Sequence, residues 1–247
     1  MSWNRDELEV QRELIRDSLQ SDSNLQDVSL NFLKSSYQRD YCYQWDWLGF
    51  PILQMPEDVV AYQELIFRCK PTVIIETGVA WGGSIALAAS ILSHLSENGR
   101  VIGIDLNLDP TLEARLGQLP LRARIELHGA SSVDIAVVQT IAESITPDDR
   151  VMVVLDSHHS HDHVYQELAL YSDLVSVGQY LIVGDTSVKD LAAETHRRRD
   201  WSSDLNPHSA VEAFLLADNN FIRDEVNNKL LTSFHPGGYL KRVAHSI

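Results

Sequence analysis

Strands and helices are predicted to alternate along residues 57–183. Short, mainly apolar runs, which are typical of strands buried on both faces, alternate with longer segments whose apolar residues recur at helical spacing. The pattern predicts helices over residues 57–69, 82–95, 111–116, 132–144 and 161–175. It predicts strands over residues 72–76, 100–105, 123–127, 150–156 and 179–183. Such alternation indicates an α/β protein with a parallel sheet and helices on both of its faces.

The N-terminal part of the chain departs from this alternation. Residues 1–33 carry leucine and isoleucine at helical spacing, which predicts an amphipathic helix. Residues 37–56 are rich in tyrosine and tryptophan. Such a segment is either a hydrophobic strap over the core or part of a binding pocket or oligomer contact. We therefore expect an N-terminal extension over residues 1–56 and one sheet-containing domain over residues 57–247.

The C-terminal pattern predicts a last strand antiparallel to its neighbour. After a helix over residues 207–217, two apolar runs at residues 229–234 and 239–243 flank an HPGG turn at residues 235–238. Glycine provides the positive φ that tight hairpin turns need. A parallel sheet closed by one antiparallel C-terminal strand is typical of methyltransferases rather than of NAD-dependent dehydrogenases.

Acidic charge restricts the partners of the chain. It has 35 acidic and 20 basic residues, and its net charge of −15 argues against nucleic acid or an anionic membrane as the main partner. Cys42 and Cys69 are too few for a disulfide framework. No apolar segment has the length or the flanks of a signal peptide or a membrane span. We expect a cytoplasmic protein that acts on a small molecule.

Residues 73–84, VIIETGVAWGGS, form a strand, a glycine turn and the start of a helix in this prediction. The N–H groups of a helix N-terminus bind ligands, and glycine lets a ligand approach the backbone closely. The spacing is not the GxGxxG of dinucleotide sites. The next strand ends at Asp105, whose carboxylate is placed either to bind both ribose hydroxyls of a nucleoside or to cap the following helix. We expect Gly78, Ala80 and Asp105 to contact a nucleoside cofactor.

Small polar residues follow the third predicted strand. The loop contains Ser131 and Ser132, and in a doubly wound sheet it opens onto the same crevice as the glycine turn. These residues suit the edge of an adenine ring. They also suit the cap of the next helix, and both roles are compatible.

Four of the ten histidines lie within residues 156–163, DSHHSHDH, directly after a buried strand. Asp156 at the strand end is expected to face the cofactor and the reacting groups, and Asp185 ends the neighbouring strand. Two carboxylates, with water and substrate oxygens, make a reasonable Mg²⁺ site. His159 is the first candidate for a general base and His158 the second, since imidazole accepts a proton near neutral pH. Individual histidines can instead cap the following helix.

Two further features of this half of the chain suggest hypotheses, one about a metal site and one about a lid. His161, Asp162 and His163 resemble half of a 2-His-1-carboxylate iron site, but oxygenases of the 2-oxoglutarate type have a β-barrel, which the α/β pattern contradicts. Residues 186–206 have the least regular pattern and follow a strand end. With a basic run at 197–199 and Trp201, they are a candidate lid that selects the acceptor.

Several segments together resemble the cephalosporin hydroxylase family, a group of class I S-adenosylmethionine-dependent methyltransferases that includes rhamnosyl O-methyltransferases. The matching segments are residues 47–62 (WLGFPILQMPEDVVAY), 70–84 (KPTVIIETGVAWGGS), 101–105 (VIGID), 155–164 (LDSHHSHDHV), 180–186 (YLIVGDT) and 229–243 (KLLTSFHPGGYLKRV). The resemblance is closer to the sugar O-methyltransferase branch. It implies a Rossmann-like, seven-stranded class I methyltransferase fold, S-adenosylmethionine as cofactor and commonly a divalent ion.

The glycine turn also resembles that of catechol O-methyltransferase. This resemblance implies that Ser84 holds the methionine carboxylate of the cofactor and Glu76 its ammonium region. It also implies that Asp105 binds the ribose and that Ser131 and Ser132 lie at the adenine.

Asp156 and Asp185 match metal-ligand positions of these families, with one departure nearby. Related sequences often have Glu-Asp where this chain has Gly184-Asp185, and Thr186 replaces an amide ligand of the catechol enzyme. One metal ligand is therefore missing or replaced by water, if the metal is Mg²⁺ or a similar cation.

Two hypotheses follow for the function. The first is an S-adenosylmethionine-dependent O-methyltransferase that acts on a hydroxyl of a sugar or other secondary metabolite, assisted by a divalent metal. A homo-oligomer is compatible with this hypothesis. The alternative is a non-catalytic subunit with a methyltransferase fold, which binds a nucleoside or a partner enzyme.

Overall fold

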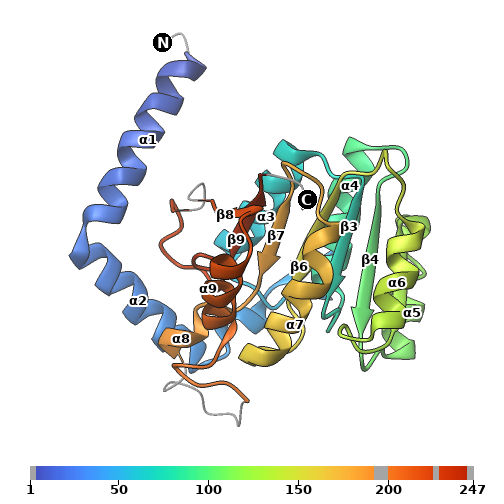
Figure 1. The fold of residues 1–247 in the computed structure, drawn as a ribbon. Helices are drawn as coiled ribbons and strands as arrows, with labels where there is room; N and C mark the ends of the chain where they lie inside the picture. The colour runs from blue at the N-terminus through green and yellow to red at the C-terminus, as the bar shows by residue number, and fades with distance from the viewer. Residues whose placement is uncertain (1–3, 192–199, 225–227, 244–247) are drawn as a thin grey trace.

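A seven-stranded sheet forms the centre of the computed structural model, which describes residues 4–191, 200–224 and 228–243 (Figure 1). Its strands are β3 (Val73–Thr77), β4 (Arg100–Asp105), β5 (Ile125–Gly129), β6 (Val151–Leu155), β7 (Tyr180–Val183), β8 (Phe221–Arg223) and β9 (Tyr239–Arg242). Their order is β5-β4-β3-β6-β7-β9-β8. The strands from β5 to β7 pair in parallel, and β9 is antiparallel to both β7 and β8. The predicted, mainly parallel α/β sheet with an antiparallel C-terminal strand is confirmed.

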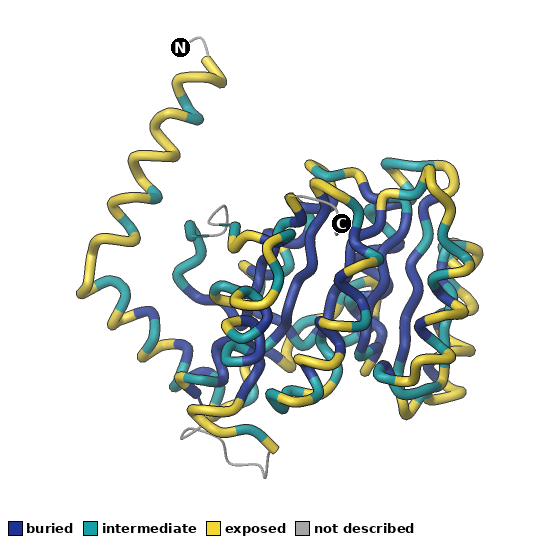
Figure 2. Tube along the Cα trace, viewed as in Figure 1, coloured by how far each residue is buried: buried dark blue, intermediate teal, exposed yellow. Residues whose placement is uncertain are grey.

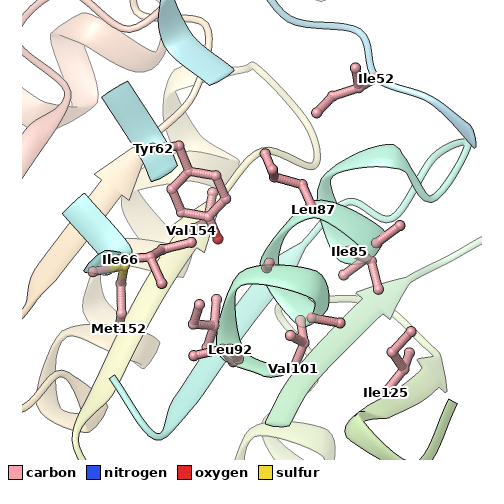
Figure 3. Packing of buried hydrophobic residues seen from close by; sticks show 14 of the residues in the cluster. Ile52, Tyr62, Ile66, Ile85, Leu87, Leu92, Val101, Ile125, Met152 and Val154 are labelled. Carbon is pink, nitrogen blue, oxygen red and sulfur yellow. The ribbon is translucent and has the colours of Figure 1, made fainter. Parts of the chain in front are cut away.

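Helices cover both faces of the sheet because successive strand residues point to opposite sides. Ile74 of β3 belongs to the cluster under α3 (Pro56–Cys69), α4 (Gly83–Leu95) and α5 (Pro110–Leu116), part of which is shown in Figure 3. Val73 and Ile75 pack on the other face, under α6 (Ile135–Ser144), α7 (His161–Tyr171) and α9 (Pro207–Ala217). Every residue of β3 and β6 is buried, which explains why β6 is apolar throughout and β3 is apolar until Glu76 and Thr77 at its carboxyl end.

The prediction of a C-terminal hairpin is partly wrong, because its first strand does not form. Residues 229–234 form no strand, and the second partner of β9 is β8, with Phe221 opposite Arg242. The segment before the turn is held elsewhere, because the Phe234 N–H and the Ser233 hydroxyl both donate to the carboxylate of Asp58 in α3. These bonds replace the ladder that a strand would make. The turn itself does use glycine, since Gly237 has a φ of +73°.

The single helix predicted over residues 1–33 is two helices. These are α1 (Arg5–Ser21) and α2 (Ser23–Tyr37), and they are divided at Asp22, whose side chain caps α2 by accepting the Leu25 N–H. No residue of α1 is buried, and the helix projects away from the sheet (Figures 1 and 2). The domain boundary at residue 56 stays a prediction. No helix of the described ranges has the length and apolar character needed to cross a membrane.

The aromatic segment after α2 lies against the start of α4. It contains a turn (Tyr41–Gln44) and a small hairpin of β1 (Asp46–Trp47) and β2 (Phe50–Pro51). The backbone of this hairpin is so close to α4 that a Cβ on Gly83 would lie 2.3 Å from the Pro51 carbonyl oxygen. The N-terminal strap is therefore packed directly onto the glycine turn between β3 and α4.

Candidate cofactor and acceptor site

The carboxyl ends of four strands place the predicted site residues at one edge of the sheet. β4 lies on one side of β3 and β6 on the other, so the strand order reverses at β3. In open α/β sheets, ligands bind at such a switch point. The glycine turn after β3, Asp105 at the end of β4, Asp156 after β6 and Asp185 after β7 all open onto this edge.

Asp105 holds the glycine turn in shape. Its Oδ2 accepts the N–H groups of Val79 and Ala80, both at 2.9 Å, and its Oδ1 accepts the Asn107 N–H at 2.8 Å. Gly78 in this turn has a φ of +87°, and a Cβ there would lie 2.1 Å from the Asp156 carbonyl oxygen. The alternative role that the sequence left open for Asp105, the cap of the following helix, is wrong, because Asp109 caps α5 by accepting the Thr111 N–H. The Asp105 side chain instead holds the glycine turn and borders a cavity.

That cavity, here called the β4-side cavity, has a volume of about 560 Å³. Its wall combines carboxylate, amide and hydroxyl groups with a few apolar side chains, and the two serines expected at an adenine ring belong to it. The lining residues are Gly78, Ile104, Asp105, Leu106, Asn107, Ser131, Ser132, Val133, Ser157, His158, Ser160, Asp162, His163 and Gln166.

A second cavity of about 210 Å³, here called the β7-side cavity, lies across Gly78 and Ser157, which line both. Aromatic residues, three aspartates and His159 surround it. The lining residues are Tyr37, Asp40, Cys42, Tyr43, Pro51, Ile52, Leu53, Gln54, Gly78, Val79, Ala80, Trp81, Gly83, Ser84, Asp156, Ser157, His159, Asp185, Trp201 and Phe234. The aromatic strap of the sequence therefore contributes to a pocket as well as covering the core.

The two candidate bases face different cavities. His159 lines the β7-side cavity with Asp156 and Asp185, and its Nε2 is 3.4 Å from Asp185 Oδ2. His158 lines the β4-side cavity, and its Nε2 is 3.6 Å from Asp200 Oδ2. This geometry favours His159 as the group beside a reacting hydroxyl.

Asp156 and Asp185 form a pair of nearby carboxylates. Burial, and next the negative charge of Asp185, raise the pKa of Asp156. A Cβ on Gly184 would lie 2.2 Å from Asp156 Oδ1, so the Asp156 carboxylate fills the space that a side chain at position 184 would need. Nowhere in residues 4–191, 200–224 and 228–243 are three or more His, Cys, Asp or Glu side chains arranged to hold a metal ion. Two hard oxygen ligands fit a divalent cation that completes its shell with water and acceptor oxygens.

Glu76 is fully buried beneath the glycine turn. Its carboxyl group accepts a hydrogen bond from the Ser84 hydroxyl, and its Oε2 has no hydrogen-bond partner among the described residues. Burial raises the pKa of Glu76 to about 8, so the group is mostly protonated at neutral pH. Ser84 lines the β7-side cavity, whereas Glu76 lines neither large cavity. The roles implied for both residues at the methionine end of a cofactor stay predictions.

A hydrogen-bond network that the sequence analysis missed supports the wall between the cavities. Ser157 Oγ donates to Glu167 Oε1 at 2.7 Å, and His163 Nε2 lies 3.2 Å from Ser157 Oγ and 3.0 Å from Ser132 Oγ. Glu167 is wholly buried. The available signal was an acidic residue four positions after His163 on the inner face of a helix, where an apolar side chain is expected.

The iron alternative finds no support in the described residues. His161 bonds through Nδ1 to Ser209 Oγ at 2.8 Å, His163 belongs to the network above, and Asp162 is exposed. Of the predicted lid, residues 192–199, which include the basic run at 197–199, lie outside the described residues. The described part places Trp201 on the β7-side cavity.

Comparison with known sequences decides the family. The model of the family described as Rhamnosyl O-methyltransferase/CmcI matches residues 39–243. The chain belongs to this family. The family is the one that the sequence motifs resemble, and membership makes the protein an S-adenosylmethionine-dependent O-methyltransferase by class.

Individual relatives agree with this assignment. The rhamnosyl O-methyltransferase of Mycobacterium tuberculosis (strain ATCC 25618 / H37Rv) is 27% identical over 202 residues, which cover 79% of this chain and 77% of the relative. The rhamnosyl O-methyltransferase of Mycobacterium leprae (strain TN) is 27% identical over 145 residues, which cover 58% of this chain and 60% of the relative.

Solved structures show the same fold at lower identity. CmcI-N160 in its apo form superposes with a TM-score of 0.60 at 22% identity and covers 82% of this chain and 77% of that one. CmcI-D160 with Mg and SAM gives 0.57 at 21% identity, with 82% and 78% covered. MycE with Mg and SAH gives 0.52 at 15% identity, with 74% and 48% covered. These likenesses confirm the class I methyltransferase fold.

Proposed function

We propose that the protein transfers the methyl group of S-adenosylmethionine to a hydroxyl of a sugar or another secondary metabolite. One observation carries the proposal: two cavities of different character meet at Gly78 and Ser157, beside Asp156. A methyl donor in one cavity and a hydroxyl in the other would approach each other where the cavities meet, as a direct group transfer between two bound molecules requires.

The β4-side cavity is suited to the nucleoside part of the cofactor. Asp105 and Asn107 offer polar groups for ribose hydroxyls, and Ser131 and Ser132 lie farther along the wall for an adenine edge. The apolar side chain of Val133 adds a surface for the base. Structures of CmcI-D160 with Mg and SAM and of MycE with Mg and SAH, which share the fold, support this choice of cofactor.

The β7-side cavity is suited to an acceptor with hydroxyl groups and apolar faces. Tyr43, Trp81 and Trp201 provide aromatic surface, while Asp40 and Gln54 provide hydrogen-bonding groups. The lining that the structure describes contains no lysine or arginine, which favours an acceptor without negative charge. The name of the mycobacterial relatives supports a sugar as acceptor.

The chain's own residues supply binding, orientation and proton transfer. His159 accepts the proton of the acceptor hydroxyl, and the Asp185 carboxylate, 3.4 Å from its Nε2, stabilises the imidazolium that forms. Asp156 and Asp185 would hold a divalent cation, with water and acceptor oxygens as the other ligands. When bound, S-adenosylmethionine supplies the methyl group, and the cation supplies positive charge that lowers the pKa of the hydroxyl.

Transfer of radiolabel from S-adenosylmethionine to a panel of glycosides, with Mg²⁺ or with a chelator, tests the proposal. Labelled product with at least one glycoside is expected. Binding of S-adenosylmethionine without transfer to any acceptor would instead favour the non-catalytic alternative. Assembly as a homo-oligomer and a cytoplasmic location remain predictions.

A further inference from the structure

His235, in the HPGG turn, makes a specific contact with the site. Its side chain is buried, and its Nδ1 accepts the backbone N–H of Asp185 at 3.1 Å. Because a backbone amide can only donate, Nδ1 carries no proton in this bond; the tautomer follows from the hydrogen-bond partners. The sequence identified the turn only as part of a hairpin, so this contact gives the motif a second role.

Asp185 needs such a contact because its backbone is in the left-handed region. Its φ is +51°, a conformation that is uncommon for residues other than glycine, although aspartate adopts it more readily than most, and that surrounding contacts stabilise. With this backbone conformation, Asp185 lines the β7-side cavity, and its Oδ2 lies 3.4 Å from His159 Nε2. The amide that His235 accepts belongs to the same residue, so the bond acts directly on the strained position.

Asp58 of α3 holds the segment that carries His235. This carboxylate is 1% exposed and accepts the Ser233 hydroxyl at 2.6 Å and the Phe234 N–H at 2.7 Å. Ser233 Oγ in turn accepts the His235 N–H at 2.9 Å. On the other side of the turn, the Thr186 hydroxyl donates to the Pro236 carbonyl at 2.9 Å. A continuous set of bonds therefore runs from α3 through residues 233–236 to Asp185.

We propose that His235 is a positioning residue for methyl transfer, which holds the Asp185 backbone so that its carboxylate meets His159 and the acceptor. The inference rests on the proposed function for the role of Asp185, but the bond itself does not depend on it. The imidazole is not needed for the sheet, since the strand pairing of β9 begins only at Tyr239. Asp58 holds residues 233 and 234 in place through hydrogen bonds, and His235 in turn holds the Asp185 backbone through its Nδ1.

Three substitutions separate the hydrogen bond from the bulk of the side chain. His235→Asn keeps an acceptor where Nδ1 lies, because the asparagine Oδ1 is the same number of bonds from Cα. His235→Gln is equally polar but places its acceptor one bond farther out. His235→Leu fills the space without any acceptor.

Crystal structures of the variants, the kcat for methyl transfer and the affinity for S-adenosylhomocysteine are the measurements. In His235→Asn, Asp185 keeps its positive φ and its distance to His159, and kcat stays within about threefold of the parent. In His235→Gln and His235→Leu, Asp185 shifts and kcat falls about tenfold or more, while S-adenosylhomocysteine binds within about twofold of the parent affinity. Rescue by asparagine alone distinguishes positioning from a general structural role.

Two results would overturn the inference. One is a folded His235→Leu protein with Asp185 in place and an unchanged kcat; the other is a folded His235→Asn protein as impaired as the leucine variant. If His235→Leu does not fold, the asparagine and glutamine variants decide by the same measurements. If the parent protein methylates no acceptor, the proposed function fails, and the position of Asp185 in the crystal structures still decides the positioning role.

Discussion

The indole of Trp201 meets the imidazole of His159 edge to face, with the ring centroids 5.4 Å apart and the planes at 80°. The neighbouring Asp200 lies 3.6 Å from His158, so two successive residues of the predicted lid contact two successive histidines. Segment 200–206 is thereby joined to the residues that follow β6. The contact places an aromatic side chain of the β7-side cavity directly against the candidate base.

Replacing Trp201 is expected to weaken acceptor binding selectively. Trp201→Ala removes the ring contact with His159 and part of the β7-side lining, and we expect KM for the acceptor to rise about tenfold, equivalent to about 1.4 kcal/mol. Trp201→Phe keeps an aromatic ring and should give a smaller rise. Steady-state kinetics measures both. An equal loss of S-adenosylhomocysteine affinity in calorimetry would contradict a role confined to the acceptor side.

Replacing Asp105 is expected to disrupt the cofactor site. Asp105→Ala leaves the N–H groups of Val79, Ala80 and Asn107 without their acceptor and removes the candidate ribose ligand. We expect S-adenosylmethionine affinity to fall at least about a hundredfold, since hydrogen bonds to charged groups contribute about 1.5–3 kcal/mol each. Calorimetry measures the loss, and Asp105→Asn, which keeps one acceptor oxygen, should lose less. Unchanged affinity in Asp105→Ala would refute the assignment.

Replacing Asp156 is expected to remove dependence on a divalent cation. Asp156→Asn deletes one of two nearby carboxylates; burial, and next the charge of Asp185, raise the pKa of Asp156. We expect kcat to fall about tenfold or more with no further response to added Mg²⁺. Asp148→Asn, on an exposed loop, is the matched control and should behave as the parent protein. Methyl transfer is measured with Mg²⁺ and with chelator. Full activity of the parent in chelator would refute the metal role.

The raised pKa of Glu76 predicts a pH-dependent stability. Because the folded-state pKa of about 8 exceeds the ordinary 4.5, the folded protein holds a proton that the unfolded chain releases in this interval. The resulting stabilisation is complete below pH 4.5 and is lost as pH rises to about 8, a change on the order of a few kcal/mol. Urea unfolding of the parent protein and of Glu76→Gln is measured at about pH 5, 6.5 and 8. As the pH rises, the free energy of unfolding of the parent should fall relative to that of the variant. Parallel curves would exclude a protonated Glu76.

The sequence pattern predicted the fold well where neighbours along the chain determine it. The buried runs of β3 and β6 and the helices between them lie within a few residues of the predicted bounds. β8 was missed because Phe221–Arg223 has three residues, two of them exposed, which is too short for a period to show. A strand at 229–234 was wrongly predicted because Ser233 and Phe234 donate hydrogen bonds to the distant Asp58 carboxylate, which no local pattern reveals.

The candidate site was predictable to the extent that topology determines it. Parallel strands end at one edge, so Asp105, Asp156 and Asp185 were expected to face one crevice, with Asp156 and Asp185 on adjacent strand ends, before any contact was known. Glu167 and His235 could not be assigned in this way, because their roles arise from side chains that are separated in sequence and meet only in the folded chain. His235, for example, bonds to a residue 50 positions away.

The two cavities draw their walls from different parts of the chain. The shared wall is formed by Gly78, where the Asp156 backbone leaves no room for a side chain, and by Ser157. The β7-side cavity takes much of its lining from residues 37–54 and from Trp201, none of which belongs to the large sheet. Changes in the loops and the N-terminal strap can therefore alter the lining of the β7-side cavity in descendants of this chain while the strand ends around Gly78 and Asp156 stay the same.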